Sequence, residues 1–220
     1  MGAIVHLTAA DGHRFAAYRA DPIGTAKGGV VLLHEIYGVN THIRGLADAL
    51  ADEGYAVRVP ALFDRAEKGV ELDYSEAGAE HGRSLRDAIG WDAPLKDIAA
   101  CIQVLRPFGG IAAVGESYGA SLGWRAAHAL PLAAAVLGSP GHLAAFARET
   151  PVCPVLIHFG ARDAKTPAEL RERIRGVPGV VAFDYDAGHA FTCPHRPGFD
   201  LLATRAAERR TYEFLARHLG

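Results

Sequence analysis

Short apolar runs recur along the chain and alternate with longer segments of helix-forming residues. Apolar runs of the length of a buried strand occupy residues 29–33, 55–59, 111–114, 133–137, 155–159 and 180–185. Helices are expected at residues 41–50, 94–106, 119–129, 167–175 and 199–218. Strands and helices that alternate in this way are typical of a parallel sheet with helical crossovers. The pattern therefore predicts an α/β fold with a doubly wound, mostly parallel sheet flanked by helices.

The chain opens with a different pattern. Residues 3–7 and 14–19 flank the dipeptide Asp11-Gly12, which is a hairpin turn signal, so an antiparallel pair is expected there. Farther on, Thr41 is expected to cap the first helix and Gly54 to close it.

Residues 61–92 interrupt the alternation. This stretch is rich in charged residues and glycine and contains no clear strand. Such an excursion from an α/β sheet is often a lid or a substrate-binding element. The alternative is a pair of solvated helices with salt-bridged faces. Candidate substrate contacts in this stretch are Arg65, His81, Arg83 and Arg86.

Length and composition fit one ordinary globular domain over residues 1–220. Half of the residues are hydrophobic and 22% are charged. The formal net charge of −2 gives no reason to expect binding to nucleic acid or to an anionic membrane surface. We expect a monomer that acts on a small molecule.

The cysteines and the amino terminus bear on location. Cys101, Cys153 and Cys193 are irregularly spaced and form no C-x-x-C, so neither a disulfide framework nor a cysteine zinc site is indicated. The first residues lack the pattern of a secretory signal, and no segment approaches the ~20 apolar residues that span a bilayer. A cytoplasmic protein is expected.

The sequence Gly115-Glu116-Ser117-Tyr118-Gly119 is a G-x-S-x-G motif between a predicted strand and a predicted helix. This is the setting of a nucleophile elbow, in which small neighbours allow a serine to occupy a sharp, strained turn. The sequence contains 25 glycines, so a glycine-rich turn without chemistry is the alternative.

Two further polar residues follow predicted strands, in the chain order that such a hydrolase requires. Asp163 comes just after strand 155–159, and His189 comes just after strand 180–185. Since the carboxyl ends of parallel strands meet at one edge of a sheet, Ser117, Asp163 and His189 are expected to lie together.

These three residue types suit nucleophilic catalysis. A serine hydroxyl needs a base to take its proton, histidine exchanges protons near neutral pH, and an aspartate can orient the histidine. No metal or other cofactor is expected. A metal site at His34-Glu35, or at the spacing of His189, Cys193 and His195, matches no known zinc motif, and the triad accounts for His189 better.

Five blocks of sequence resemble the dienelactone hydrolase family of α/β-hydrolases. They are HEIYGVN at 34–40, GYAV at 54–57 with Pro60, the elbow, FGARD at 159–163 and AGHAF at 187–191. The resemblance covers nearly the whole chain, and its most discriminating block is HEIYGVN. It implies an α/β-hydrolase fold and hydrolysis of an ester or lactone, with dienelactone as the best-known substrate of the family.

The resemblance also implies roles for single residues. Ser117 corresponds to the nucleophile, His189 to its base and Asp163 to the residue that orients the base. Glu35 corresponds to a glutamate that pairs with the nucleophile. The backbone N–H groups of Ile36 and Tyr118 correspond to the oxyanion hole. Tyr37, His81 and Arg83 are the substrate-binding candidates.

The chain departs from the family pattern in two ways. The better-known members have cysteine at the nucleophile position, so Ser117 is either a native nucleophile or a replacement of cysteine. Those members also hold the substrate carboxylate with arginines, one of them four residues beyond the catalytic histidine, where this chain has Cys193. An anionic dienelactone is therefore less secure as the substrate than an ester or lactone in general. The alternatives are a broad carboxylesterase or thioesterase, or a non-catalytic binding protein.

Overall fold

A computed structural model describes residues 2–220, which divide into two compact units. The first unit extends to Ile111 and includes Leu219, and the second comprises residues 112–218 with Gly220. Both units combine strands with helices, so the predicted α/β class is confirmed. Of the helices in the described residues, none is long and apolar enough to cross a membrane.

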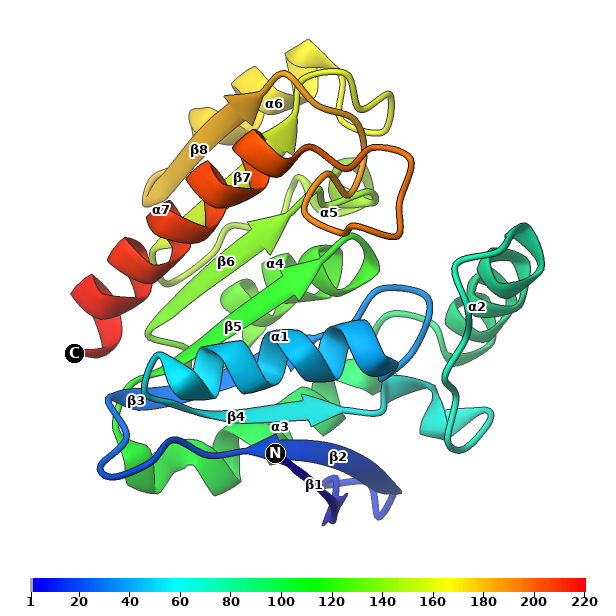
Figure 1. Cartoon of the computed structure of the whole chain (residues 1–220), viewed down its shortest axis with the longest axis vertical. Coiled ribbons are helices and arrows are strands. Elements are labelled where there is room, and N and C mark those ends of the chain that lie inside the picture. Colours follow the sequence, from blue (N-terminus) through cyan, green and yellow to red (C-terminus); the bar gives the residue numbers. More distant parts are fainter. Residues whose placement is uncertain (1) are drawn as a thin grey trace. The chain divides into compact units, whose positions relative to one another are not determined.

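The first unit contains strands β1 to β4 and helices α1 to α3. Its strands are β1 (Ala3–Thr8), β2 (Arg14–Ala20), β3 (Gly28–Leu33) and β4 (Tyr55–Pro60). Its helices are α1 (Thr41–Asp52), α2 (Glu76–Ile89) and α3 (Ala93–Leu105), with 3₁₀ turns η1 (Leu62–Arg65) and η2 (Arg106–Phe108). The strands pair in the order β1-β2-β4-β3. Helices α1 and α3 cover opposite faces of β3 and β4 (Figure 1).

The predicted hairpin at the start of the chain is confirmed, because β1 and β2 pair in antiparallel fashion. Strand β2 also pairs antiparallel with β4, whereas β3 and β4 are parallel. The turn closes with a hydrogen bond from the Gly12 N–H to the Ala9 carbonyl at 2.9 Å. Gly12 has a φ of +83°, which glycine adopts without the steric cost of a side chain.

Helix α1 begins one residue away from the predicted cap. Thr41 is its first helical residue, and Asn40 is the cap, since the Asn40 side chain accepts a hydrogen bond from the Ile43 N–H at 3.1 Å. The prediction of Thr41 as the cap was therefore wrong. Both side chains can cap a helix, and only Asn40 has the extended backbone that the position requires.

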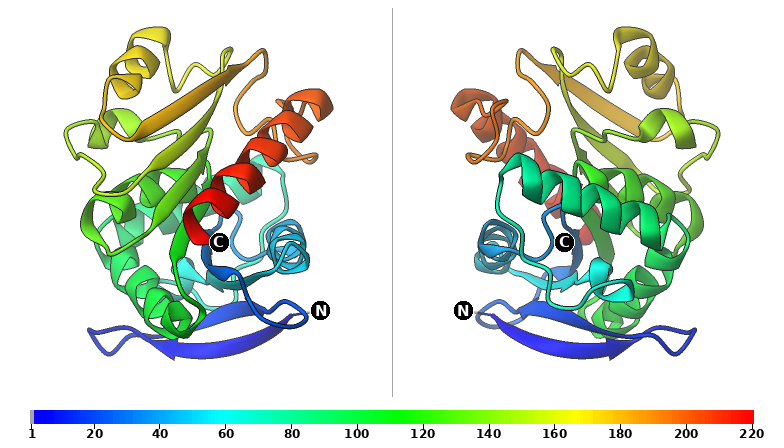
Figure 2. Two further views of the ribbon diagram at one scale, coloured as in Figure 1. Left: turned by 90° about the vertical axis from the view of Figure 1, so that its left-hand side faces the viewer. Right: turned by 90° about the vertical axis from the view of Figure 1, so that its right-hand side faces the viewer.

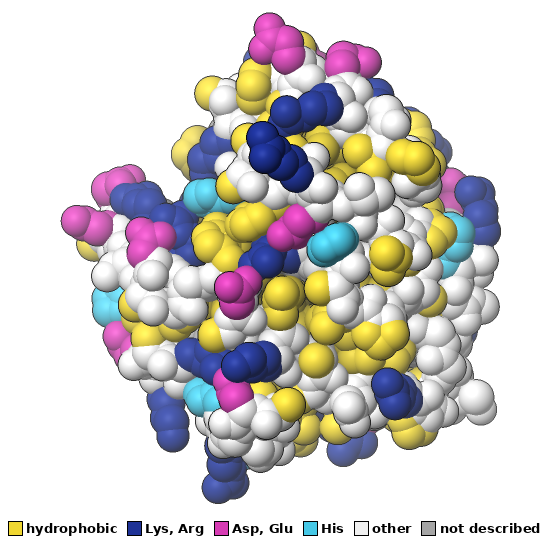
Figure 3. Space-filling view, turned by 180° about the vertical axis from the view of Figure 1, so that it is seen from behind, with side chains coloured by type: hydrophobic (Ala, Val, Ile, Leu, Met, Phe, Trp, Pro, Cys, Tyr) yellow, Lys and Arg dark blue, Asp and Glu magenta, His cyan; other side chains and the backbone are white. Residues whose placement is uncertain are grey.

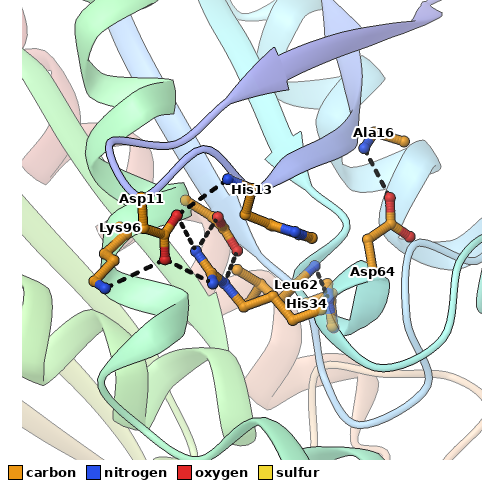
Figure 4. Close-up of polar contacts among 9 residues, drawn as sticks. Asp11, His13, Ala16, His34, Leu62, Asp64 and Lys96 are labelled. Atoms are coloured by element: carbon orange, nitrogen blue, oxygen red, sulfur yellow. Dashed lines mark hydrogen bonds and ion pairs between the residues drawn. The ribbon is translucent and has the colours of Figure 1, made fainter.

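Residues 61–92 contain η1 and α2 and no strand. Arg65 anchors the start of this stretch, because its guanidinium bonds both carboxylate oxygens of the buried Asp97 at 2.8 Å. The same guanidinium pairs with Asp11 at 3.0 Å. Figure 4 shows Asp11 also reaching Lys96, at 3.2 Å. The stretch is thus tied to the hairpin and to α3 by a charge network.

The second unit carries the parallel strands β5 to β8. They are β5 (Ile111–Glu116), β6 (Ala134–Gly138), β7 (Val155–Gly160) and β8 (Val180–Tyr185), which pair in that order. The helices are α4 (Tyr118–Ala129), α5 (Leu143–Phe146), α6 (Ala168–Arg175) and α7 (Leu201–Leu219). Helix α7 lies on one face of these strands, and α4 and α6 lie on the other (Figures 1 and 2).

Apolar packing fixes the strands of the second unit. Every residue of β6 and β7 is buried, as expected for central parallel strands covered on both faces. Helix α7 packs on β8 through a cluster formed by Tyr185, Ala187, Phe191 and Ala207. The carboxyl ends of these strands are thereby held at fixed positions along one edge.

All three cysteines are free thiols, and all are buried. Burial raises the pKa of Cys101 far above its ordinary value and raises the pKa of Cys153 to about 11. Both thiols are therefore protonated and unreactive at neutral pH. The surface seen in Figure 3 carries charges of both signs among hydrophobic side chains, in keeping with the small net charge.

Candidate active site

Ser117 occupies the turn between β5 and α4. Its backbone has a φ of +50° and a ψ of −103°, a conformation that is rare for a residue with a side chain. The strained turn predicted from G-x-S-x-G is thus observed. The Ser117 N–H donates to the Gly138 carbonyl at 2.8 Å, which ties the turn to the end of β6.

Gly115 explains why the turn can be so sharp. A Cβ atom at this position would lie 2.4 Å from the Gly119 carbonyl oxygen, closer than any side chain tolerates. Only glycine allows α4 to fold back directly onto β5. The turn places Ser117 at the N-terminal end of α4, where the helix dipole is positive.

Asp163 follows β7 in a turn that is buried against the loop after β8. The Asp163 side chain accepts a hydrogen bond from the Lys165 N–H at 3.0 Å. At the end of β7, a Cβ atom on Gly160 would lie 2.3 Å from the Gly188 carbonyl oxygen. Glycine at position 160 therefore lets the two loops approach each other closely.

His189 joins the other two residues. Its Nδ1–H donates to Asp163 Oδ2 at 2.7 Å, and its Nε2 lies 2.9 Å from Ser117 Oγ. A carboxylate can only accept, so Asp163 fixes the proton on Nδ1 and leaves the Nε2 lone pair for the serine hydroxyl. The three side chains form one continuous hydrogen-bonded chain that is able to remove the hydroxyl proton.

Asp163 is held in its ionised form. Burial by itself would raise the pKa of this carboxyl group, but the hydrogen bonds from His189 and the Lys165 N–H, with the positive charge of Lys165, outweigh burial. The pKa of Asp163 therefore lies below its ordinary value. An ionised Asp163 can stabilise the imidazolium that forms when His189 takes up a proton.

Further contacts set the direction of the His189 loop. The Ala190 N–H donates to Ser139 Oγ at 3.1 Å, just beyond β6. The Thr192 hydroxyl donates to the Glu116 carboxylate at 3.1 Å. These residues were not predicted from the sequence, although Glu116 lies inside the elbow motif and Ser139 lies two residues beyond a predicted strand.

Lys165 also reaches the histidine. Its Nζ lies 3.3 Å from His189 Nε2, the same nitrogen that faces Ser117. The lysine is exposed and follows Asp163 by two residues. No sequence pattern points to Lys165, because its approach to His189 depends on how two loops meet.

Glu35, Ile36 and Tyr37 lie in the first unit, directly after β3. Glu35 is buried, and Tyr37 packs on Tyr74 with ring centroids 4.4 Å apart.

The structure brings Ser117, Asp163 and His189 together within the second unit. The same unit contains Tyr118, which is the first residue of α4.

His34 holds the segment after β3 through its own ring. Its Nδ1–H donates to the Glu35 carbonyl at 2.5 Å. Its Nε2 accepts from the Leu62 N–H at 3.3 Å (Figure 4). Burial lowers the pKa of His34 to about 4, so the ring is neutral at physiological pH. With both nitrogens engaged, His34 has no lone pair to offer a metal ion. In residues 2–220 no cluster of three or more potential ligands from His, Cys, Asp and Glu occurs.

The charged candidates in residues 61–92 form ion pairs within the first unit. His81 Nε2 lies 2.8 Å from a Glu67 carboxylate oxygen, and Arg83 bonds Glu76 at 2.8 Å. The side chains of His81 and Arg83 are 45% and 43% exposed, so both pairs can open at little cost. Arg86 pairs with its neighbour Asp87.

Comparison with known proteins gives consistent matches along the chain. The model of the dienelactone hydrolase family matches residues 15–219. A carboxymethylenebutenolidase of Pseudomonas putida is 30% identical over 96% of this chain and 95% of its own, and one of Pseudomonas sp. strain P51 is 31% identical over 96% and 93%.

Solved structures agree on the fold. A Klebsiella pneumoniae structure provisionally assigned as a dienelactone hydrolase superposes with a TM-score of 0.79 at 25% identity, covering 98% of this chain and 99% of its own. A Pyrococcus furiosus esterase gives 0.68 at 20% identity, covering 100% and 94%. The predicted α/β-hydrolase fold is thereby confirmed.

Proposed function

Since this chain belongs to the dienelactone hydrolase family and is an ester- or lactone-hydrolysing enzyme, we propose that it works through an acyl-enzyme formed on Ser117. The observation that carries the proposal is the hydrogen-bonded chain from Ser117 through His189 to Asp163. A site without catalytic activity would have no chemical need for all three groups in this hydrogen-bonded arrangement.

The geometry supports a two-step reaction. His189 Nε2 takes the proton of Ser117 as Oγ attacks the substrate carbonyl carbon, and a tetrahedral oxyanion forms. His189 then returns the proton to the departing alkoxide oxygen, and the carbonyl re-forms as an ester of Ser117. In a lactone the departing oxygen stays tethered to the acyl group. Water, activated by His189 in the same way, hydrolyses the acyl-enzyme and restores the serine.

The oxyanion needs hydrogen-bond donors. Tyr118 supplies a backbone N–H at the start of α4, and the family resemblance assigns the second N–H to Ile36. Losing one such donor typically costs on the order of 10²–10³ in rate. Glu35 is assigned by the same resemblance to pairing with the nucleophile. Tyr37, His81 and Arg83 are the candidates for substrate binding. No cofactor takes part in this scheme.

Two substrate classes compete within this reaction. The carboxymethylenebutenolidase relatives favour a dienelactone, whereas Cys193, at the position of a family arginine, favours a broader carboxylesterase or thioesterase. A cysteine side chain has no positively charged form, so the buried Cys193 offers no cation to a substrate carboxylate. We propose ester or lactone hydrolysis as the activity, with dienelactone as the first substrate to test.

The test measures hydrolysis of dienelactone and of p-nitrophenyl acetate by the wild type, Ser117→Ala and Ser117→Cys. Ser117→Ala should lose nearly all turnover on both substrates and should no longer react covalently with an active-site phosphonate. Normal rates in Ser117→Ala would refute the nucleophile assignment. A Ser117→Cys enzyme that is much faster on dienelactone would indicate a site suited to a thiolate.

A further inference from the structure

Lys165 places an ammonium group beside the base of the triad. Its Nζ lies 3.3 Å from His189 Nε2, and Ser117 Oγ lies 2.9 Å from the same atom. Gly141 leaves room for this approach, since a Cβ there would lie 3.1 Å from the lysine Cδ and 3.3 Å from the His189 Cε1. The main chain of Lys165 is fixed by its hydrogen bond to Asp163.

The two donors compete for one acceptor. A neutral imidazole with its proton on Nδ1 has a single lone pair at Nε2, and both the serine hydroxyl and the lysine ammonium are directed at it. An ammonium group only donates hydrogen bonds. Its contact therefore occupies the Nε2 lone pair of His189 without helping to remove the Ser117 proton. Each moment that Nε2 accepts from Lys165 is a moment when Ser117 lacks its base.

The contact between Lys165 and His189 becomes repulsive as the reaction proceeds. Once His189 has taken the serine proton, the ring is an imidazolium with N–H donors at both nitrogens. An ammonium at the distance seen in the resting site would then face a like charge, which disfavours protonation of the ring. Efficient turnover therefore requires that the ammonium move away from Nε2 or be neutralised by an anion.

We infer that Lys165 binds a carboxylate on the acyl part of the substrate and leaves His189 when it does so. This deepens the proposed function and rests on it. The side chain is suited to such a movement, because it is exposed and its charge sits on a flexible four-carbon stem above a fixed main chain. Lys165 is then the residue that determines how strongly this enzyme prefers an ester or lactone with an anionic acyl group over a neutral one.

The inference predicts opposite effects on two matched substrates. Mono-p-nitrophenyl succinate carries a carboxylate on its acyl group, and p-nitrophenyl butyrate is a neutral ester of similar length with the same leaving group. Lys165→Met should lower kcat/KM for the succinate ester by roughly tenfold or more, the scale of one charge-assisted hydrogen bond. For the butyrate ester kcat/KM should stay the same or rise, because residue 165 no longer competes with Ser117 for His189 Nε2.

Two further variants serve as controls. Lys165→Arg keeps a cation and should retain the preference for the succinate ester. Arg148→Met removes a positive charge from an exposed side chain just beyond α5, and it should leave the ratio of the two substrates unchanged. The wild-type preference should weaken as ionic strength rises, and Lys165→Met should show no such dependence.

Equal losses on both esters in Lys165→Met, or an unchanged ratio, would overturn the inference while leaving the proposed function intact. Failure of the proposed function has a different signature, in which the wild type hydrolyses neither ester and the phosphonate leaves Ser117 unlabelled.

Discussion

Three residues at the site hold backbone conformations that side chains rarely adopt. Ser117, Ser139 and Ala190 are the non-glycine residues with positive φ in residues 2–220, at +50°, +47° and +55°. Hydrogen bonds connect their loops, from Ser117 N–H to the Gly138 carbonyl and from Ala190 N–H to Ser139 Oγ. Each such conformation costs about 1–3 kcal/mol. The strain is concentrated where the ends of three strands present the triad.

Ser139 should act as a positioning residue for His189. Ser139→Ala leaves the buried Ala190 N–H without its acceptor, and the adjacent imidazole should lose its alignment. We expect kcat for ester hydrolysis to fall roughly tenfold with KM little changed, the scale of a lost hydrogen bond to a buried group. Steady-state kinetics on p-nitrophenyl acetate provides the measurement.

A second substitution separates orientation from backbone strain. Ser139→Gly also removes the hydroxyl but adopts positive φ freely, so it should be more stable to urea than Ser139→Ala while showing the same loss of kcat. Wild-type kcat in both variants would contradict the positioning role.

Single residues of the site differ in how far they could be predicted. Ser117, Asp163 and His189 each follow an apolar run, and the edge of a parallel sheet brings such positions together. Ser139, Lys165 and Thr192 carry no comparable signal, because their contacts depend on the path of loops between the strands. Their partners become evident only when the strand ends are placed side by side.

At the scale of elements, helix α2 depends on one glycine. A Cβ atom on Gly82 would lie 1.8 Å from the Ile36 carbonyl oxygen, so α2 approaches the segment after β3 more closely than any side chain permits. This segment is also fixed by His34 and contains the proposed oxyanion donor Ile36.

Gly82→Ala should therefore lower both the free energy of unfolding and the esterase activity. The matched control is Gly45→Ala in α1, where an added Cβ meets nothing within 4 Å. That change should raise the free energy of unfolding by roughly 0.5–1 kcal/mol through helix propensity and leave activity unchanged. Urea titration of both variants measures the contrast, and a Gly82→Ala protein as stable as Gly45→Ala would refute the packing interpretation.

Element positions were predictable to within a few residues, and their ends were less so. The strand expected at 133–137 is observed at Ala134–Gly138, and the helix expected at 199–218 is Leu201–Leu219. That helix begins late because the Asp200 side chain accepts from the Ala203 N–H at 2.8 Å and acts as its cap. The short helix α5 was not predicted, since four residues carry too little periodicity to be recognised.

At the scale of the whole molecule, two buried histidines link stability to pH. Burial lowers the pKa of His34 to about 4, and burial together with the charge of Arg210 lowers that of His158 to about 3. The His158 ring forms hydrogen bonds with the Tyr185 hydroxyl at 2.9 Å and the Thr211 hydroxyl at 3.0 Å. These bonds join β7, β8 and α7. In the unfolded chain both rings titrate near the ordinary value of ~6.5.

The direction in which the free energy of unfolding changes with pH follows from proton binding. Below pH ~6.5 the unfolded chain takes up protons that the folded chain excludes, so the free energy of unfolding should fall as the pH drops toward 4. Each histidine contributes a slope of up to about 1.4 kcal/mol per pH unit. Urea titrations between pH 6.5 and 4 should show a shallower slope for His158→Gln than for the wild type.

His6→Gln is the matched control for this measurement. His6 lies exposed on β1, away from the buried rings, so its replacement should leave the slope unchanged. Equal slopes in His158→Gln and the wild type would contradict the neutral buried ring.

The fold as a whole was accessible from the sequence because its strands and helices alternate with strong apolar contrast. The parallel direction of most strand pairs follows from that alternation, whereas the order of the strands does not. The charge network of Arg65 with Asp11 and Asp97 was not accessible, since it joins residues from the hairpin, η1 and α3 whose proximity only the folded chain reveals.

The burial of all three native thiols has a practical consequence for active-site titration. In Ser117→Cys the new thiol would stand at the end of β5, while Cys101, Cys153 and Cys193 remain enclosed. A thiol-selective reagent applied to the folded variant should therefore report the number of competent sites per molecule. The wild type supplies the blank, and the fraction of correctly formed enzyme in a preparation can be counted directly.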